Sequence, residues 1–153
     1  MDASVIIMQV FTGLSLGMLY VLLALGLSII FGLLTVVNFA HGAMYMWGAY
    51  VGVAVVALTG NFWLALVVTP LVMGAYGLIV ERWLIRPLYG RDINYPLLLT
   101  FGLLFIMVEI VRIFWGTSDQ PFSAPEILSM PVELFGIFYF PSYRLFVIGI
   151  TVV

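Results

Sequence analysis

Residues 3 to 80 contain no Asp, Glu, Lys or Arg, and this uncharged stretch restricts the possible folds more than any other feature of the chain. A water-soluble domain exposes charged side chains over much of its surface, and this stretch has none to expose. Lipid or other membrane spans must therefore cover these residues. The composition agrees, with 65% apolar residues, 8% charged residues and a mean hydropathy of +1.25. The sequence predicts an all-α integral membrane protein, a polytopic bundle of transmembrane helices.

Turn signals and charged clusters divide the chain into about four complete spans and the start of a fifth. We place the spans at about residues 5–37, 39–58, 62–80 and 95–115, with a partial span at 143–153. The last stretch supplies about half of the roughly 20 residues that a bilayer requires. We therefore predict a single transmembrane domain over residues 1–153, truncated at its C-terminal end and continued in a longer protein.

The first apolar run, residues 5–37, is too long for a simple span. As one helix it would reach about 50 Å, whereas the hydrocarbon core is about 30 Å thick. We expect its first two turns to lie in the headgroup region, with a broken helix as the alternative. Small residues in the run allow another helix to approach closely. The glycines that we assign to helix packing are Gly13, Gly17, Gly26 and Gly32.

The stretch NFAHGAMYMWGAYVG, residues 38–52, carries the polar groups of the second span. At 100° per residue, one narrow stripe combines an amide, an imidazole, a phenol and two glycines. Its members are Asn38, His41, Tyr45, Gly48 and Gly52. Lipid cannot satisfy these polar groups, so the stripe should face the bundle interior. Two interpretations stay open: a structural polar clamp between helices, or the wall of a substrate path.

The turns around this span carry signals of their own. The turn at residues 35–38 is uncharged, so we expect it to be buried in protein, and Asn38 suits the N-cap of the following helix. Residues 59–61, Thr-Gly-Asn, predict a tight turn. Pro70 predicts a kink in the third span.

The distribution of charge predicts the orientation in the membrane. Residues 81–94 are the first strongly polar segment and contain Arg82, Arg86 and Arg91. By the positive-inside rule this loop is cytoplasmic, which puts the N-terminus outside. Anchoring explains the arginines, and contact with a cytoplasmic partner is the alternative. Residues 116–142 are acidic and rich in proline, so they form an external loop, in which residues 132–140 form a small hairpin or lie on the membrane surface.

The fourth span contains an internal pair of opposite charges, Glu109 and Arg112. Their i, i+3 spacing places both on one helix face, where they can pair. Charges within membranes are candidates for function. Since these two lie near the outer end of the span, a structural role with the side chains reaching the headgroups is the simpler interpretation.

Several classes of function find no support. The chain has no cysteine and one histidine, so we expect no metal site. It has no lysine and no basic run, which argues against nucleic-acid binding. We find neither a phosphate-binding loop nor a nucleophile–base pair, and so predict no catalytic residues and no cofactor.

Three stretches carry a family resemblance: the motif NFAHGAMYMWGAY, residues 38–50, the run GLSLGMLYVLLALGLSIIFGLLTVV before it, and ERWLIRPLYGR after it. With them the chain resembles the permease subunits of branched-chain amino-acid ABC importers, the LivH type. The resemblance is good over residues 10 to about 115 and looser beyond. Family members are nearly twice as long, so the chain is similar to their N-terminal half. Several members have an acidic residue where this chain has Ala43.

The resemblance implies a transport subunit of the bacterial cytoplasmic membrane rather than an enzyme. The implied partners are a second permease subunit, two cytoplasmic ATPases that hydrolyse ATP, an external substrate-binding protein and the lipid bilayer. Importers of urea or short amides share much of the pattern, so they are one alternative. A structural membrane subunit that conducts nothing is the other.

Overall fold

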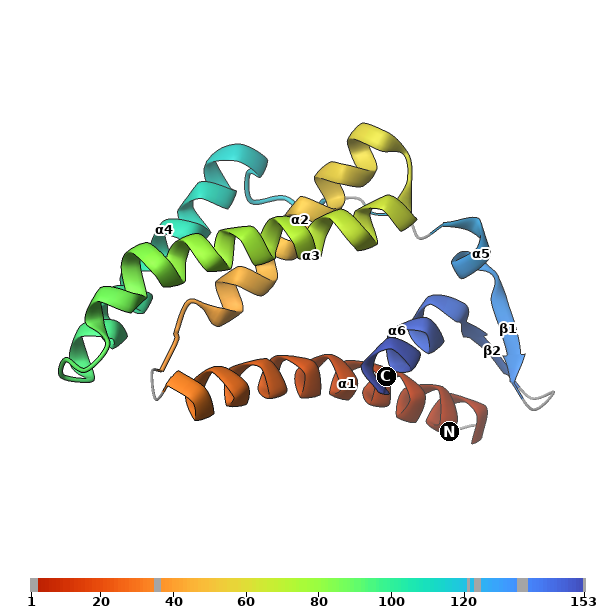
Figure 1. The fold of residues 1–153 in the computed structure, drawn as a ribbon. Helices are drawn as coiled ribbons and strands as arrows, with labels where there is room; N and C mark the ends of the chain where they lie inside the picture. Colours follow the sequence, from red (N-terminus) through yellow and green to blue (C-terminus); the bar gives the residue numbers. More distant parts are fainter. Residues whose placement is uncertain (1–2, 35–36, 121, 123–124, 135–137, 153) are drawn as a thin grey trace. The chain divides into compact units, whose positions relative to one another are not determined.

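The computed structural model describes residues 3–34, 37–120, 122, 125–134 and 138–152 (Figure 1). The long helices are α1 (Ala3–Leu34), α2 (His41–Thr59), α3 (Phe62–Val80) and α4 (Asn94–Trp115). The short elements are the π-helical turn η1 (Glu81–Ile85), the 3₁₀ turn η2 (Arg86–Leu88), α5 (Glu126–Ser129), β1 (Pro131–Leu134), β2 (Phe138–Pro141) and α6 (Ser142–Val152). The four long helices are long and apolar enough to cross a membrane. The predicted all-α, polytopic class is confirmed.

Helix α1 is continuous over Ala3–Leu34. A rise of 1.5 Å per residue makes it roughly 48 Å long, well beyond the hydrocarbon thickness of about 30 Å. A break within residues 3–34 is therefore excluded, while residues 35–36 of the expected turn lie outside the described residues. The placement of the first two turns in the headgroup region stays a prediction.

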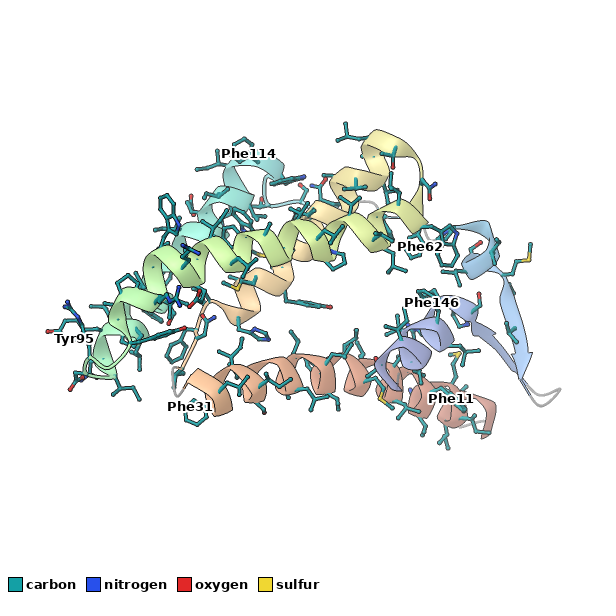
Figure 2. All side chains as sticks on the ribbon, in the orientation of Figure 1. Phe11, Phe31, Phe62, Tyr95, Phe114 and Phe146 are labelled. Carbon is teal, nitrogen blue, oxygen red and sulfur yellow. The ribbon has the colours of Figure 1, made fainter. Side chains whose placement is uncertain are left out.

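Large apolar side chains stand out from the long helices (Figure 2). Phe31 on α1 is 51% exposed and Phe114 on α4 is 76% exposed. A soluble protein would bury side chains of this size, because exposing them to water costs about 25 cal/mol per Å² of apolar surface. These surfaces are suited to contact with lipid or with further transmembrane helices.

The chain divides into two compact units, one of residues 27–122 and one of residues 1–26 with 123–153. In the first unit α2 packs against both α3 and α4, and α3 crosses α2 on its way to η1 (Figure 1). Small alanines at the start of α2 let the helices approach closely. The buried cluster consists of Ala40, Ala43, Val80, Ile85, Leu103 and Met107.

The turn between α2 and α3 has the predicted form. Gly60 adopts a left-handed backbone with φ of 67°, and its N–H donates to the Val56 carbonyl at 2.8 Å, which ends α2. The Asn61 side chain then caps α3 by accepting from the N–H groups of Trp63 and Leu64. Helix α3 continues through Pro70, which lacks the N–H for one intrahelical bond.

The arginine-containing segment differs from the prediction of a loop over residues 81–94. Its first part is helical, because η1 and η2 continue α3 to Leu88. The ring of Pro87 cannot fit against the carbonyl of an ordinary helical turn, and the preceding turn is widened so that the Arg86 N–H donates to the Glu81 carbonyl. The true turn is confined to residues 89–93, where Gly90 has a φ of 76°.

The second unit contains the predicted hairpin. Strands β1 and β2 pair antiparallel, with Pro131 opposite Pro141. Helix α6 follows directly and is a shorter apolar helix than the four candidate spans. Arg144 on α6 donates a hydrogen bond from Nη1 to the Thr12 hydroxyl of α1, which joins the two helices.

Thr100 on α4 holds the segment that precedes α2. Its side chain is fully buried, and its Oγ1 accepts from the Phe39 N–H at 3.2 Å. The same oxygen lies 3.3 Å from the Val37 carbonyl and 3.2 Å from the Leu97 carbonyl, to one of which the hydroxyl donates. One side chain thus satisfies backbone groups that lipid could not.

We expect Thr100→Val to destabilise the protein by about 1–3 kcal/mol, because valine keeps the shape but leaves the Phe39 N–H without its acceptor. The thermal unfolding midpoint of the purified full-length subunit in detergent measures the effect. Thr117→Val, at an exposed position beyond the end of α4, is the matched control and should leave the midpoint unchanged. Equal midpoints for the two variants would contradict this role of Thr100.

Candidate functional site

The segment that enters α2 corrects one prediction. Asn38 is buried, and its Oδ1 accepts from the Ala40 N–H at 3.0 Å. Ala40, which has helical backbone angles, is the residue next to the first turn of α2, and no side chain caps this helix end. The assignment of Asn38 as the N-cap is therefore wrong. It closes a turn just before the helix, and the His41 N–H donates to its backbone carbonyl at 3.2 Å.

The five residues of the predicted stripe have different surroundings. Gly48 and Gly52 face α3, where a Cβ would lie 3.8 Å from Met73 Cγ and 3.5 Å from Thr69 Oγ1 respectively. These glycines therefore serve the α2–α3 contact. His41 is half-buried and Tyr45 is 51% exposed. Because Asn38 precedes the helix, the rotation of 100° per residue does not place it on one face with the other four residues of the stripe.

Trp47 is the central contact residue of α2, and the sequence analysis did not single it out. Its Nε1–H donates to the Met107 carbonyl of α4 at 2.9 Å. Its ring stacks on Tyr76 of α3 at 5.1 Å between centroids and 26° between planes. A tryptophan inside an apolar span needs an acceptor for its N–H, and that requirement is the signal that could have identified it.

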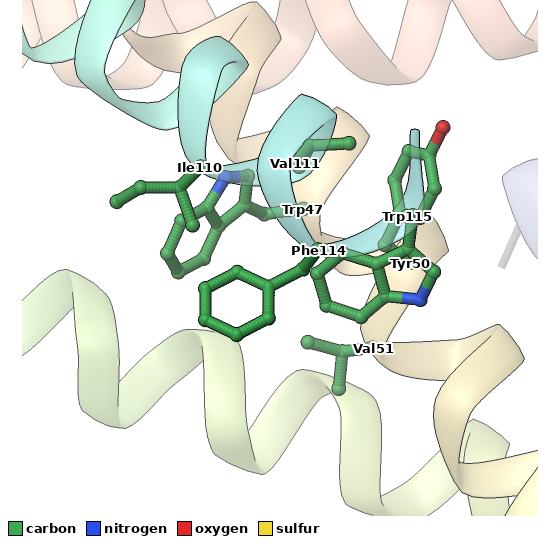
Figure 3. Close-up of a pocket in the computed structure, with 7 residues that line it drawn as sticks. All are labelled: Trp47, Tyr50, Val51, Ile110, Val111, Phe114 and Trp115. Carbon is green, nitrogen blue, oxygen red and sulfur yellow. The ribbon is translucent and has the colours of Figure 1, made fainter. Parts of the chain in front are cut away.

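Trp47 also forms one wall of an apolar pocket of about 250 Å³ between α2 and α4 (Figure 3). The lining residues are Trp47, Tyr50, Val51, Ile110, Val111, Phe114 and Trp115. The rings of Tyr50 and Trp115 lie 5.3 Å apart and are tilted by 53°. No charged residue lines this pocket, so it suits an aliphatic or aromatic group rather than an ionic one.

The charged pair on α4 has the geometry expected from its spacing. Arg112 Nη1 lies 3.6 Å from Glu109 Oε2, and the two side chains are 60% and 61% exposed. A pair so open to its surroundings contributes little to stability in water, about 0–1 kcal/mol. Neither residue lines the apolar pocket. A functional role for the pair stays a prediction.

The three arginines of η1, η2 and the following turn, Arg82, Arg86 and Arg91, are exposed. Close to them, the Tyr89 hydroxyl donates to Glu81 Oε1 at 3.2 Å. Desolvation by partial burial, together with this hydrogen bond and the Glu81 charge, raises the pKa of Tyr89, while Arg86 acts in the opposite direction. Tyr89 is therefore neutral near pH 7 and keeps its donor.

The role of the α1 glycines in helix packing stays a prediction. A Cβ at Gly13, Gly17 or Gly32 would meet no other atom of the described chain within 4 Å. The described residues therefore show no close helix contact at these three positions, and packing through Gly26 also stays a prediction.

Arg144 is a second residue that the sequence analysis did not single out. It borders a separate cavity of about 140 Å³ between α1 and α6. The signal available in the sequence was the presence of one arginine within the otherwise apolar residues 143–153. A charge in such a position is a candidate for function.

Residues 9–153 match the profile of a protein family described as the permease component of the branched-chain amino acid transport system. The chain belongs to this family. The resemblance inferred from residues 38–50 is therefore confirmed. The chain is similar to BraD of Pseudomonas aeruginosa, which is 30% identical over 123 residues and is named a high-affinity branched-chain amino acid transport system permease protein. The LivH proteins of Escherichia coli K12 and Salmonella typhimurium carry the same description, with 31% identity over 122 residues and 29% over 120.

These alignments cover 72–73% of this chain but 39% of each relative. The chain thus spans well under half the length of the curated permeases that it matches. No solved structure gives a significant match.

We expect Trp47→Phe to weaken the contact between α2 and α4, because phenylalanine can still stack on Tyr76 but cannot donate to the Met107 carbonyl. The loss should be about 0.5–1.5 kcal/mol, the usual contribution of one hydrogen bond. Thermal unfolding of the full-length subunit in detergent measures it. Trp83→Phe, at a 75% exposed tryptophan of η1, is the control. A loss as large in the control would show that the bond to Met107 is not the cause.

Proposed function

We propose that the chain is part of a permease subunit of an ATP-binding-cassette importer that carries branched-chain amino acids across the bacterial cytoplasmic membrane. The family match over residues 9–153 is the observation that carries this proposal. The four apolar helices and the apolar pocket between α2 and α4 are physically suited to it. ATP hydrolysis is assigned to partner subunits.

The proposed assembly has two permease subunits, two cytoplasmic ATPases and an external binding protein that delivers the substrate. The alignments cover 39% of each relative, and we assign no residue of this chain to the coupling with the ATPases. Within the chain, the exposed arginines of residues 81–94 are the candidates for contact with a cytoplasmic partner. The same arginines set the proposed orientation, with the N-terminus outside.

An aliphatic amino acid needs a mostly apolar path with a few hydrogen bonds for its charged ends. Since Asn38, Gly48 and Gly52 are engaged in local packing, His41 and Tyr45 are the members of the stripe that we retain as pathway candidates. Their positions on α2, the helix that contacts both α3 and α4, support this choice.

The proposed orientation predicts that a cysteine at Arg86 reacts only from the cytoplasmic side. Residues 1–153 contain no cysteine, so Arg86→Cys introduces the one thiol of this stretch. A membrane-impermeant maleimide should label it in inside-out vesicles and not in intact spheroplasts. Ser118→Cys, at an exposed position after α4, should show the reverse pattern. Labelling of position 86 in intact spheroplasts would contradict the orientation.

We expect His41→Ala to lower ATP-dependent leucine uptake by about two- to thirteenfold, the effect of losing one hydrogen bond of about 0.5–1.5 kcal/mol. Uptake is measured in proteoliposomes that contain the complete importer. Asn38→Ala should instead reduce the yield of assembled complex, because it removes a bond that shapes the turn before α2. Ser118→Ala serves as the control.

The same experiment separates the functional alternatives. Uptake of urea or short amides but not leucine would favour the related importers. A wild-type subunit that brings no ATPase through purification and supports no uptake would favour a structural role. Unchanged uptake kinetics in both the Asn38 and His41 variants would remove the second helix from the pathway.

A further inference from the structure

Arg144 lies in the first turns of α6, beside the N-terminal half of α1. Its guanidinium donates to two hydroxyls, from Nη1 to Thr12 and from Nε to Tyr143 at 2.9 Å. The guanidinium carbon also lies 5.7 Å from the centre of the Tyr143 ring. These contacts hold the planar group in a defined position at the edge of the cavity between the two helices.

The cavity is lined by both polar and apolar side chains. It measures about 140 Å³ and is lined by Thr12, Ser15, Leu16, Leu19, Tyr143, Arg144 and Val147. Arg144 contacts the hydroxyls of Thr12 and Tyr143, which makes a polar end, and Leu16, Leu19 and Val147 supply the apolar lining. The Ser15 hydroxyl donates to the Phe11 carbonyl at 2.9 Å, so it is directed back to α1. None of the seven lining residues is acidic.

This combination selects a particular ligand chemistry. Guanidinium binds carboxylate through paired, charge-assisted hydrogen bonds, which are stronger than bonds between neutral groups. Leucine and valine side chains favour an aliphatic chain and reject a second charge. An amphiphile with a carboxylate at one end and a short branched hydrocarbon at the other satisfies both ends of the cavity.

We propose that this cavity is a binding site for an aliphatic amino acid, with Arg144 on the carboxylate and Leu16, Leu19 and Val147 around the side chain. The proposal rests on the proposed import function and adds a site that the stripe on α2 did not provide. Such a site would discriminate against urea and short amides, because they carry no carboxylate to pair with the guanidinium.

The proposed orientation puts the cavity on the side from which substrate arrives. Thr12 lies nine residues after the start of α1, which is about 14 Å along the helix. Helix α1 exceeds the hydrocarbon thickness by roughly 18 Å. If the first two turns of the apolar run lie in the outer headgroup region, as proposed, Thr12 and Arg144 are near the outer edge of the hydrocarbon. A substrate released by an external binding protein would meet this site early.

The test measures equilibrium binding of radiolabelled L-leucine to the complete importer in nanodiscs, without the external binding protein. Arg144→Gln should weaken leucine binding by about tenfold or more, and Arg144→Lys should restore part of it. L-leucinamide, which lacks the carboxylate, should compete poorly with leucine in the wild type. Thr151→Val, which removes a hydroxyl of α6 at a position that does not line the cavity, is the control.

A second variant tests the apolar end without touching the charge. Val147→Leu adds bulk there and should weaken the binding of leucine more than that of alanine. An unchanged ratio of the two affinities would contradict the assignment of this end to the side chain. This variant keeps the proposal testable if Arg144→Gln does not assemble.

Three results would overturn the proposal while the wild-type complex still imports leucine. The first is an unchanged affinity for leucine in Arg144→Gln. The second is an equal loss of affinity for leucine and for leucinamide in that variant. The third is a loss of leucine affinity in Arg144→Gln that appears only in nanodiscs with anionic lipids. Import of leucine by a complex that binds none at millimolar concentration would also overturn it. Failure of the proposed function is distinct, because then the wild-type complex would import no leucine at all.

Discussion

The absence of water in a bilayer core is the constraint on which the described structure depends. Each backbone N–H and C=O that a helix end leaves open must find a partner within the protein. Side chains supply such partners in the segments on either side of α2. Thr100 and Asn38 serve the segment before it, and Asn61 caps the helix that follows. The few polar side chains of the uncharged region are therefore largely occupied by the backbone, which leaves few of them for a substrate.

This use of polar groups narrows the choice of pathway residues on α2. The pattern of the sequence placed five residues on one stripe, but a stripe can serve more than one neighbour. Gly48 and Gly52 let α3 approach, while Trp47, one position away, connects α2 to α3 and α4 together. What remains of the stripe is one imidazole and one phenol, His41 and Tyr45. A helix this strongly engaged in packing provides a rigid wall and contributes polar contacts at only a few points.

Much of the fold could be predicted from hydropathy alone, because apolar length and charge position determine where helices can cross a membrane. The turn at Gly60 followed from local residue preferences, and the hairpin after α5 was one of two alternatives that the sequence left open. The extension of α3 through η1 and η2 could not be read in this way, since charge suggested a loop where backbone geometry allows helix up to Leu88. Trp47 and Arg144 were missed for another reason. Their importance depends on partners about 60 and 132 residues away in the chain, and one sequence does not show which distant residues meet.

The arginines show why surroundings, more than charge itself, decide what a basic residue can do. The three in residues 81–94 are exposed, and Arg112 pairs with Glu109 on an open helix face, so water or headgroups weaken the field around each of them. Arg144 instead borders a cavity with aliphatic walls, where a lower dielectric strengthens charge–charge attraction. A carboxylate that enters such a cavity loses hydration and needs a cation in place to compensate. A neutral amide loses less hydration free energy on entry and gains less electrostatic attraction from the guanidinium. Selectivity between the two then comes from placing the guanidinium and the aliphatic wall side by side, which is the arrangement that α1 and α6 create.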